Sequence, residues 1–380
     1  MNIKNITVLG SGIMGHGIAQ VSAMAGYNVI LRDVEQQFLD KAMEKIKWSL
    51  DKLVSKQKIS KEEADKILSR IIPKVDLVES LKNCDLLIEA VPEIMDLKKK
   101  VYAEVDKTAN SNTVFASNTS TLPITEIANT ISRPEKFIGI HFFNPPQLMR
   151  LVEVIPGQKT SKELIETTMN FVRTVSKEPV LCKKDVAGFI VNRIFIPLVH
   201  EAAWAMEREG ASMTEIDSAV KFRLGFPMGI FELADFTGLD VIHKATIEMH
   251  SRDKKVINPH PKIEELFNQK KLGQKSGSGF YEYAGDKYER IELSEQLATK
   301  FNPIRLVANI LNNAAWLVTN QVSDIPEIEK ALQLGMGLKK QIFQTGREFG
   351  ITNIVNELRI QAKKYGQFYE PDPLLVSMQS

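Results

Sequence analysis

The sequence predicts an α/β protein in which a domain with a mainly parallel, doubly wound sheet precedes an all-α region present in two copies. Three observations predict this class. Short apolar runs typical of strands alternate with helical segments up to residue 182, an order that favours parallel strands joined by helices. Long helices with apolar periodicity replace them after Asp185. Part of this helical region then recurs 112 residues further along the chain.

The domain boundaries follow from these changes in texture. We expect the first boundary near residues 183–186, where the helical region begins, and a polar linker from Ala284 onward. The expected parts are a sheet domain at 1–184, a first helical copy at 185–283, a linker at 284–303 and a degenerate second copy at 304–380.

The first domain opens with a strand, a glycine-rich turn, a helix and a second strand. Residues 3–9 are a β-rich run that ends in the segment GSGIMG. The following HGIAQVSAMAG predicts a helix closed by Gly26, and NVILRD at 28–33 predicts the next strand.

Two Lys- and Glu-rich helices are expected within residues 34–72, as an inserted helical hairpin. The second helix opens at Ser60 with Glu63 three residues on, which is a capping-box pattern. Further strands, mostly separated by helical segments, are expected at 85–91, 113–118, 137–143, 151–155 and 178–182.

Length and charge limit the possible partners. The chain has 380 residues, enough for two or three domains with their own cores. Its formal net charge is +2, so no global field attracts nucleic acid or an anionic membrane, and an anionic ligand must be bound locally.

The N-terminal sequence and the two cysteines indicate the cellular compartment and whether a metal site is expected. The chain enters strand-like sequence at once, without the pattern of a cleaved leader, and no apolar run is long enough to span a bilayer. Cys84 and Cys182 are isolated, so we expect no disulfide framework and no metal site. A cytoplasmic, reducing location is the default expectation.

Three glycines after the first strand indicate a cofactor-binding loop. Gly10, Gly12 and Gly15 form GxGxxG between a strand and a helix, the context typical of Rossmann-like dinucleotide-binding domains. The first glycine permits a tight turn, the second lets a pyrophosphate approach the backbone, and the third allows close helix–strand packing. The helix start supplies N–H groups to the phosphates. We expect Ile13 and Met14 to belong to the same loop.

Asp33 predicts which dinucleotide is bound. It lies 18 residues after Gly15, at the end of the next strand, where a carboxylate accepts hydrogen bonds from ribose hydroxyls and repels a 2′-phosphate. Arg32 is a possible phosphate partner and leaves NADP tolerance open. On an alternating strand, however, it points to the opposite face, so NAD is the expected cofactor.

The stretch IGIHFFNPPQLMRLVEVI at 138–155 places a base and an acid in two apolar runs. Burying an unpaired charge costs on the order of several kcal/mol, so His141 and Glu153 either pin two strands together or serve chemistry. The cofactor loop upstream favours chemistry. An alcohol oxidised by a nicotinamide cofactor gives its hydroxyl proton to a base, and histidine oriented by a carboxylate suits that role.

The helical repeat aligns residues 192–204 with 304–316, and 215–238 with 327–350, without gaps. The second copy has Ile304 in place of Asn192 and Arg347 in place of Asp235, so we expect its polar functions to be lost. The shared pairs are Arg193/Arg305, Trp204/Trp316, Gly225/Gly337, Phe231/Phe343 and Gly238/Gly350.

A series of motifs closely resembles the L-3-hydroxyacyl-CoA dehydrogenase family, which includes 3-hydroxybutyryl-CoA dehydrogenases. The resemblance covers nearly the whole chain. It implies NAD-dependent, reversible oxidation of (S)-3-hydroxyacyl-CoA in fatty acid metabolism and β-oxidation, with 3-hydroxybutyryl-CoA and acetoacetyl-CoA among the substrates. The motifs are GSGIMG (10–15), IEAVPE (88–93), FASNTSTLPI (115–124), HFFNPPQLMRLVEV (141–154), DVAGFIVNRIFIP (185–197) and FPMGIFELADFTGLD (226–240).

The resemblance also implies roles for single residues. His141 corresponds to the general base and Glu153 to its partner. Ser120 corresponds to a serine that contacts the substrate hydroxyl and the cofactor, and Asn192 to an asparagine that positions the thioester end of the substrate.

Further binding residues are implied in the same way. Ser49 and Lys56, seven residues apart on the first inserted helix, correspond to CoA contacts, although a solvated lysine-rich face is the alternative there. The remaining cofactor contacts implied are Glu93, Lys98, Asn144 and Lys275.

Two other functions stay open from the sequence. The chain resembles, less closely, dehydrogenases of non-CoA hydroxy acids such as the gulonate dehydrogenases related to lens crystallins; the HFFNPP and FELADFTGLD segments favour acyl-CoA. A catalytically silent NAD-binding subunit is disfavoured by the joint presence of His141, Glu153, Ser120 and Asn192.

The repeat suggests an oligomeric state. Members of the family with one helical copy tend to dimerise through it, and longer members carry two copies. The second copy is then expected to cover, within one chain, the surface that a partner subunit would cover, giving a monomer with an internal pseudo-dimer; a homodimer is the alternative.

Overall fold

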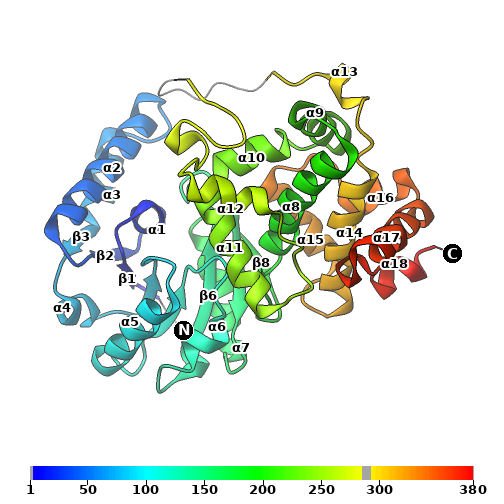
Figure 1. The fold of residues 1–380 in the computed structure, drawn as a ribbon. Coiled ribbons are helices and arrows are strands. Elements are labelled where there is room, and N and C mark those ends of the chain that lie inside the picture. Colours follow the sequence, from blue (N-terminus) through cyan, green and yellow to red (C-terminus); the bar gives the residue numbers. More distant parts are fainter. Residues whose placement is uncertain (1–2, 285–291, 380) are drawn as a thin grey trace. The chain divides into compact units, whose positions relative to one another are not determined.

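The computed structural model describes residues 3–284 and 292–379 (Figure 1). The chain divides into two compact units, Met1–Asp185 and Val186–Ser380, each of which is described by itself. The predicted fold class is confirmed: the first unit holds a mostly parallel sheet with helices, and the described part of the second unit is mainly helical.

One sheet organises the first unit. Its strand order is β3-β2-β1-β4-β5-β6-β7-β8. Strands β1 to β6 are parallel, β7 is antiparallel to β6, and β8 is parallel to β7. The strands are β1 (Asn5–Leu9), β2 (Asn28–Arg32), β3 (Ile71–Lys74), β4 (Leu86–Glu89), β5 (Val114–Ser117), β6 (Phe137–Phe142), β7 (Leu151–Pro156) and β8 (Glu178–Leu181).

Helices cover both faces of this sheet. On one face, apolar side chains of α1 (Ile13–Met24), α2 (Gln36–Ser55), α3 (Lys61–Ser69) and α7 (Lys162–Thr174) pack with alternate strand residues such as Val8 and Ile140. On the other face, the buried Tyr102 of α5 packs its ring against Phe115 and Phe137. The bounds on this face are α4 (Leu77–Leu81), α5 (Met95–Thr108) and α6 (Ile124–Ala128), followed by the short η1 (Pro134–Lys136).

The strand β3 was missed from the sequence. The expected second helix of the hairpin included Ile71, but α3 ends at Ser69 and Ile71 begins β3 beside β2. Pro73 masked the strand because proline is depleted in sheets; it is tolerated here since β3 is an edge strand of the described sheet. Helices α2 and α3 therefore form the connection between β2 and β3.

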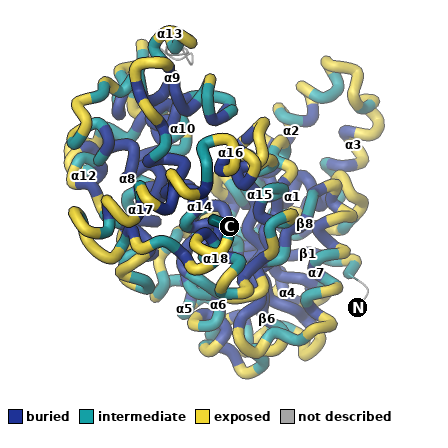
Figure 2. The backbone as a smooth tube through the Cα atoms, turned by 90° about the vertical axis from the view of Figure 1, so that its right-hand side faces the viewer, coloured by how far each residue is buried: buried dark blue, intermediate teal, exposed yellow. Residues whose placement is uncertain are grey.

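Helix α2 is amphipathic, which explains its Lys-rich sequence. Its buried side chains Leu39, Ala42, Ile46 and Leu50 recur at helical spacing and join the core of the first unit. The opposite side is exposed along much of α2 and α3, drawn in yellow in Figure 2. Trp48 lies on this side with 61% of its surface exposed.

The second unit shows the repeat directly. Three helices of the first copy and three of the second begin 112 residues apart, at Met213 and Ile325, Ile230 and Ile342, and Leu239 and Ile351. The bounds are α8 (Val191–Glu209), α9 (Met213–Leu224), α10 (Ile230–Thr237), α11 (Leu239–Arg252), α12 (Pro261–Asn268), η2 (Gln274–Ser276), α13 (Glu295–Ala298), α14 (Ile304–Thr319), α15 (Ile325–Met336), α16 (Ile342–Phe349), α17 (Ile351–Tyr365), η3 (Gln367–Tyr369) and α18 (Pro373–Ser377).

Matching glycines and carboxylates explain why corresponding helices of the two copies begin and end at matching positions. Gly225 and Gly337 end α9 and α15 in the left-handed conformation, at φ 81° and 71°, which glycine adopts without strain. The carboxylates of Asp217 and Glu329, again 112 residues apart, accept the backbone N–H groups of Phe231 and Phe343. Both copies thus retain the acid that caps the next helix.

Helices α8 and α14 pack against each other through a buried ion pair. Arg305 of α14 donates to the carboxylate of Glu201 on α8, and both side chains are almost wholly buried. Tyr369 donates to the second oxygen of Glu201 at 2.8 Å, and Gln361 accepts from Arg305 at 3.1 Å. These additional hydrogen bonds offset the cost of burying two charges.

The predicted linker at 284–303 contains residues 285–291, which lie outside the described residues. Within its described part, α13 opens at Ser294, whose hydroxyl accepts the Leu297 N–H. Ala298 of this helix is buried, and α13 contacts α9. The linker therefore includes an element that packs in the second unit.

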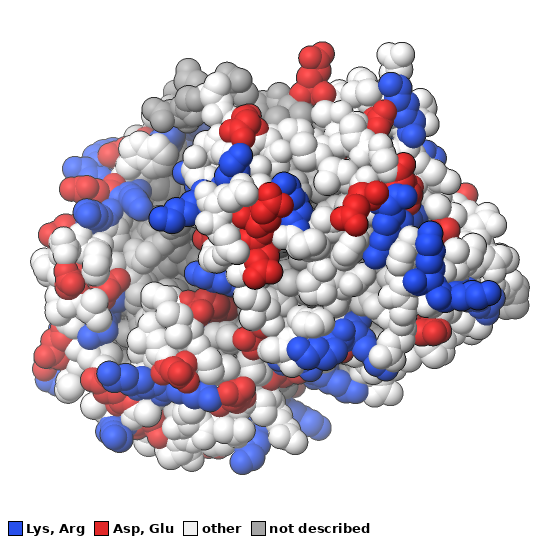
Figure 3. Space-filling model, viewed as in Figure 1, with Lys and Arg blue, Asp and Glu red and all other residues white. Residues whose placement is uncertain are grey.

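Surface charge and hydropathy agree with the composition. Basic and acidic side chains are interspersed over the face shown in Figure 3. Among the described residues, no helix combines the length and the apolar character needed to cross a membrane.

His200 gives the second unit a testable pH dependence. Its Nδ1 accepts the His260 N–H at 2.9 Å and its Nε2 lies 2.8 Å from the Thr246 hydroxyl, so the imidazole is neutral. Burial, assisted by nearby histidines, lowers the pKa of His200 to about 3. In the unfolded chain it titrates near 6.5, so the stabilisation present above pH 6.5 is lost as pH falls toward 3.

We therefore expect the free energy of unfolding to fall between pH 7.5 and 5.5, with about 1.4 kcal/mol of that loss due to His200. Urea unfolding at the two pH values measures it. The His200→Gln variant, although destabilised, should lose this part of the pH dependence; an equal dependence in the variant would contradict the assignment.

Candidate active site

The glycine loop after β1 is shaped by close backbone contacts. Gly10 has φ 90°, and a Cβ there would lie 2.6 Å from the carbonyl oxygen of Ala90. A Cβ on Gly15 would lie 1.7 Å from the Gly10 oxygen. Neither site accommodates another residue without backbone movement. A Cβ on Gly12, in contrast, meets no atom within 4 Å, which leaves space beside the backbone where a phosphate could lie.

The start of α1 is equipped for an anion. Gly12 is the N-cap residue, no side chain caps the helix, and its first turn contains no acidic residue. The first N–H groups of a helix carry partial positive charge and lack partners within the helix. Ile13 is 62% exposed beside them, and Met14 is half-buried. The loop therefore fits the pyrophosphate of a dinucleotide.

Asp33 lies next to this loop. Its Oδ2 accepts hydrogen bonds from the N–H and the hydroxyl of Ser11, both at 2.7 Å, and its Oδ1 accepts the Val34 N–H. These contacts hold the carboxylate beside the glycine turn. Arg32 is turned elsewhere, because its Nε donates to the carbonyl of Val75 at 3.0 Å. The expected separation of Arg32 from Asp33 is thus present.

His141 and Glu153 are directly opposite each other on β6 and β7. His141 Nδ1 lies 2.7 Å from Glu153 Oε2, and Glu153 has no exposed surface while His141 is 6% exposed. A carboxylate can only accept, so the Nδ1–H donates to it, and in the neutral imidazole the lone pair then belongs to the other ring nitrogen, Nε2. The ring also packs against that of Phe143, tilted by 45° with the two centroids 4.5 Å apart.

The carboxyl end of β4 carries a buried network, of which the sequence singled out only Lys98 and Glu93. Lys98 of α5 lies 2.6 Å from Glu89 and 3.2 Å from Glu93. Glu89 also accepts the Ser117 hydroxyl at 2.7 Å. Burial alone would lower the pKa of Lys98, but the two carboxylates raise it, so it stays charged. Lys98 and Glu89 are at most 1% exposed.

Glu93 connects this network to the segment after β5. Its Oε1 accepts the Thr119 hydroxyl at 2.6 Å and the Ser120 N–H at 2.9 Å, and the Ser120 hydroxyl lies at 3.2 Å. Burial alone would raise the pKa of Glu93, but Lys98 and these donors hold it below its usual range. Glu93, Lys98 and Ser120, predicted separately, are therefore brought together.

The segments after β5 and β6 are also joined. The side chain of Asn118 accepts the Phe142 N–H at 2.9 Å, which ties the residue after His141 to the strand end at Ser117. Asn144 follows in the connection to β7, and the Asn144–Pro145 peptide bond is cis. This links the loops that carry Ser120 and Asn144.

Ser49 and Lys56 share one face of α2, since seven residues are close to two helical turns. Ser49 is half-buried and accepts a hydrogen bond from Gln20 of α1 at 3.0 Å, and Gln147 donates to the same Gln20 at 3.2 Å. Lys56 is exposed at the C-cap. The helix therefore presents one anchored polar side chain and one exposed cation.

The remaining predicted residues belong to the second unit. Asn192 lies in the first turn of α8 and is half-buried. Lys275, in η2, forms an ion pair with Asp240 of α11 and is 47% exposed.

Some of the residues that the sequence did not single out had a usable signal. Glu89 ends the buried strand LLIE as Asp33 follows NVILR, and Ser117 and Asn118 stand in the motif that contains Ser120. Gln20 and Gln147 had no comparable signal, because glutamine is ordinary in helices and loops. Only the fold brings Gln20 to Ser49 and Gln147 to Gln20.

Comparison with family models matches both units. Residues 5–186 match the 3-hydroxyacyl-CoA dehydrogenase, NAD binding domain. Residues 188–283 and again 301–380 match the 3-hydroxyacyl-CoA dehydrogenase, C-terminal domain.

Relatives point the same way. The chain is 42% identical over 288 residues to the mitochondrial hydroxyacyl-coenzyme A dehydrogenase of Rattus norvegicus, covering 74% of this chain and 91% of the rat protein. It is 40% identical over 280 residues to 3-hydroxybutyryl-CoA dehydrogenase of Clostridioides difficile, covering 73% and 99%.

A solved structure extends the likeness to the second helical copy. The crystal structure of 3-hydroxybutyryl-CoA dehydrogenase from Escherichia coli K12 substr. MG1655 superposes with a TM-score of 0.89 at 28% identity, covering 100% of this chain and 98% of that chain. With both family models matched over nearly the whole chain, this protein belongs to the 3-hydroxyacyl-CoA dehydrogenase family.

Proposed function

We propose that this chain is an NAD-dependent (S)-3-hydroxyacyl-CoA dehydrogenase that interconverts (S)-3-hydroxyacyl-CoA and 3-oxoacyl-CoA, with short-chain substrates among those it accepts. The observation that carries the proposal is the buried His141–Glu153 pair, at 2.7 Å, in a unit that matches the NAD binding domain of the family. The pair supplies a base with a defined proton-accepting nitrogen.

In the proposed reaction, His141 Nε2 takes the proton of the C3 hydroxyl. Bound NAD supplies the acceptor for the hydride that leaves C3. Glu153 holds the Nδ1–H and stabilises the imidazolium that forms, because its carboxylate faces the ring from a fully buried position. In the reverse direction, His141 returns the proton to the C3 oxygen.

Binding and positioning roles are also proposed for five further residues. Ser120, held by Glu93, orients the substrate hydroxyl, and Asn192 positions the thioester. Lys98, which the resemblance implied as a cofactor contact, is only 1% exposed, so its role is proposed instead as a positioning residue that keeps Glu93 ionised and in place. On α2, Lys56 offers a cation to the CoA phosphates, and Ser49 is a neighbouring donor.

Cofactor contacts are proposed for two further sets of residues. The glycine loop with Ile13 and Met14 takes the pyrophosphate, and Asp33 takes the adenosine ribose hydroxyls. Glu93, Asn144 and Lys275 are proposed on the nicotinamide side.

A monomeric state and a reducing compartment are also proposed. A monomer fits the internal repeat, since α14 of the second copy packs on α8 of the first. A reducing compartment such as the cytoplasm fits Cys84 and Cys182, which are both buried and form no disulfide in the described structure.

The function is tested by NADH oxidation with acetoacetyl-CoA, for which we expect turnover that CoA alone inhibits. Free acetoacetate should not replace the thioester. His141→Ala should lower kcat by roughly 100-fold or more, since general base catalysis contributes about 10²–10⁴-fold. Glu153→Gln should lower kcat in the same direction while NADH binding, measured by fluorescence, is kept.

The assay has clear contrary results. Unchanged turnover in His141→Ala would remove the proposed base, and equal turnover of free acetoacetate would favour a dehydrogenase of non-CoA hydroxy acids.

Asp33 is expected to determine cofactor choice. Its replacement by alanine removes charge-assisted hydrogen bonds, each about 1.5–3 kcal/mol, and the repulsion of a 2′-phosphate. We expect the KM for NADH to rise by roughly 10-fold or more. The preference for NADH over NADPH, measured from kcat/KM with acetoacetyl-CoA, should shrink in parallel. An Arg32→Ala variant serves as the neighbouring control and should leave the preference unchanged.

Deleting residues 304–380 tests the internal pseudo-dimer. The deletion removes Arg305 from the buried Glu201 and exposes the apolar face of α8. We expect the shortened chain to form dimers or aggregates in sedimentation experiments, whereas the full chain sediments as a monomer. A soluble monomer after deletion would show that α14 covers no self-associating surface.

A further inference from the structure

Three polar side chains form a hydrogen-bonded chain in the first unit, from the β6–β7 connection across α1 to α2. Gln147, which lies in the connection between His141 and Glu153, donates from its Nε2 to Oε1 of Gln20 on α1 at 3.2 Å. Gln20 donates from its own Nε2 to Oγ of Ser49 on α2 at 3.0 Å. The chain therefore joins the connection that follows the proposed base to the helix proposed to bind CoA.

Gln20 is the fixed middle member of this chain. It has no exposed surface, its Oε1 accepts from Gln147, and its Nε2 lies 3.9 Å from the sulfur of Met24 as well as near Ser49. A buried amide needs a donor for its oxygen and an acceptor for its nitrogen, so its neighbours decide which way it faces. Because Gln147 supplies the donor, Gln20 presents its N–H to Ser49.

The hydroxyl of Ser49 differs from other hydroxyls on the helices of this unit. Ser55, Ser69 and Thr108 each donate to a backbone carbonyl three or four residues earlier in the chain. Ser49 instead accepts from Gln20, and no residue in the described part of the chain accepts its hydroxyl hydrogen. Since Ser49 is half-buried, this hydrogen is available to a ligand.

Close packing holds the first member of the chain in place. A Cβ on Gly17 would lie 2.9 Å from Oε1 of Gln147 and 3.0 Å from two ring carbons of Pro146. Gly17 precedes Gln20 by three residues, so the two positions share one side of α1. The missing side chain at Gly17 thus lets the β6–β7 connection pack directly on α1, which keeps the Gln147 donor at the oxygen of Gln20.

Coenzyme A carries acceptors that suit the Ser49 hydroxyl. The phosphate oxygens of its nucleotide accept hydrogen bonds, and Lys56 provides a cation on the same face of α2. A hydroxyl that already accepts one hydrogen bond is a better donor of the next, because members of such a chain polarise one another. Ser49 as a donor and Lys56 as a cation therefore both match a phosphate.

We propose that Gln147 and Gln20 are positioning residues of the CoA site, which direct the Ser49 hydroxyl hydrogen at a phosphate oxygen of CoA. The inference rests on the proposed function, which assigns Ser49 to CoA. It adds that this contact is set by residues that do not touch CoA themselves, one of them in the connection between His141 and Glu153.

Gln147→Glu tests the direction of the chain. A carboxylate can only accept, so Gln20 turns its N–H toward position 147 and its oxygen toward Ser49, whose hydroxyl then donates to Gln20. We expect the Kd for CoA, from calorimetric titration of the full chain, to rise about 10-fold, as in Ser49→Ala. Gln147→Leu, which removes the donor without adding a charge, should weaken CoA binding in the same direction.

Two comparisons distinguish positioning of Ser49 from a general loosening of the connection or from repulsion by the new charge. In the Ser49→Ala background, Gln147→Glu should cause no further rise in the Kd for CoA. With acetoacetyl-pantetheine, which lacks the nucleotide phosphates, kcat/KM should be the same in Gln147→Glu as in the parent. With acetoacetyl-CoA, KM should rise while kcat at saturation stays near that of the parent.

The contrary results are equally specific. Parent-like CoA binding in Gln147→Glu or Gln147→Leu would overturn the inference, and so would an equal loss with both thioesters or a full further loss in the Ser49→Ala background. In these cases the parent still reduces acetoacetyl-CoA, so the proposed function stands. A parent that neither binds CoA nor reduces acetoacetyl-CoA would defeat both.

Discussion

The pairing of β6 with β7 is the constraint on which the proposed site depends. All strands from β1 to β6 run one way, and β7 reverses the direction, which places Glu153 directly opposite His141. In a strand, a shift by one residue moves every side chain to the other face. The alternating apolar residues of β7 pack into the core and fix its register, so burial of Val152 and Val154 also determines where the carboxylate lies.

The burial of Lys98 is a second constraint on the first unit. One ammonium contacts two carboxylates, Glu89 at the end of β4 and Glu93 in the following loop, and Glu93 in turn holds the Ser120 segment. Removing one member of such a network leaves the others buried without compensation. The network thus joins the ends of β4 and β5 and stabilises one conformation of the loops that follow them, beside the glycine turn.

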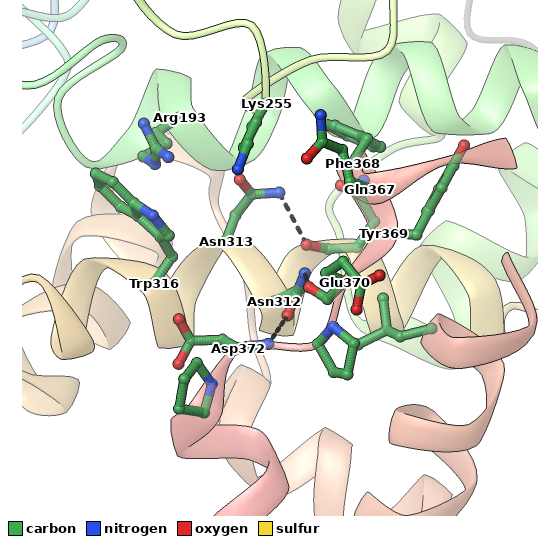
Figure 4. A pocket seen from close by; sticks show the side chains of 14 residues that line it. Arg193, Lys255, Asn312, Asn313, Trp316, Gln367, Phe368, Tyr369, Glu370 and Asp372 are labelled. Atoms are coloured by element: carbon green, nitrogen blue, oxygen red, sulfur yellow. Dashed lines mark hydrogen bonds between the residues drawn. The ribbon is translucent and has the colours of Figure 1, made fainter. Parts of the chain in front are cut away.

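The second unit illustrates how a duplicated domain diverges. Its apolar frame, helix starts and capping acids recur at the same offset, since packing and backbone hydrogen bonding constrain both copies alike. Polar positions were free to change. Glu201 retains its buried pair with Arg305, whereas the matching Asn313, 112 residues further along, lines a cavity together with Arg193 (Figure 4).

The sequence by itself determined the fold class, the positions of most strands along the chain, the internal repeat and the spacing of the glycine loop. These features depend on local periodicity and on residues close in the chain. It predicted the His141–Glu153 contact for the same reason, as the two residues flank one short connection. It missed β3, since Pro73 hides an edge strand, and it did not select Glu89, Gln20 or Gln147. Only the tertiary structure determined this strand and the contacts of these residues, because their partners lie on other strands and helices. Burial, which makes a hydrogen-bond partner necessary, is a property of the folded chain.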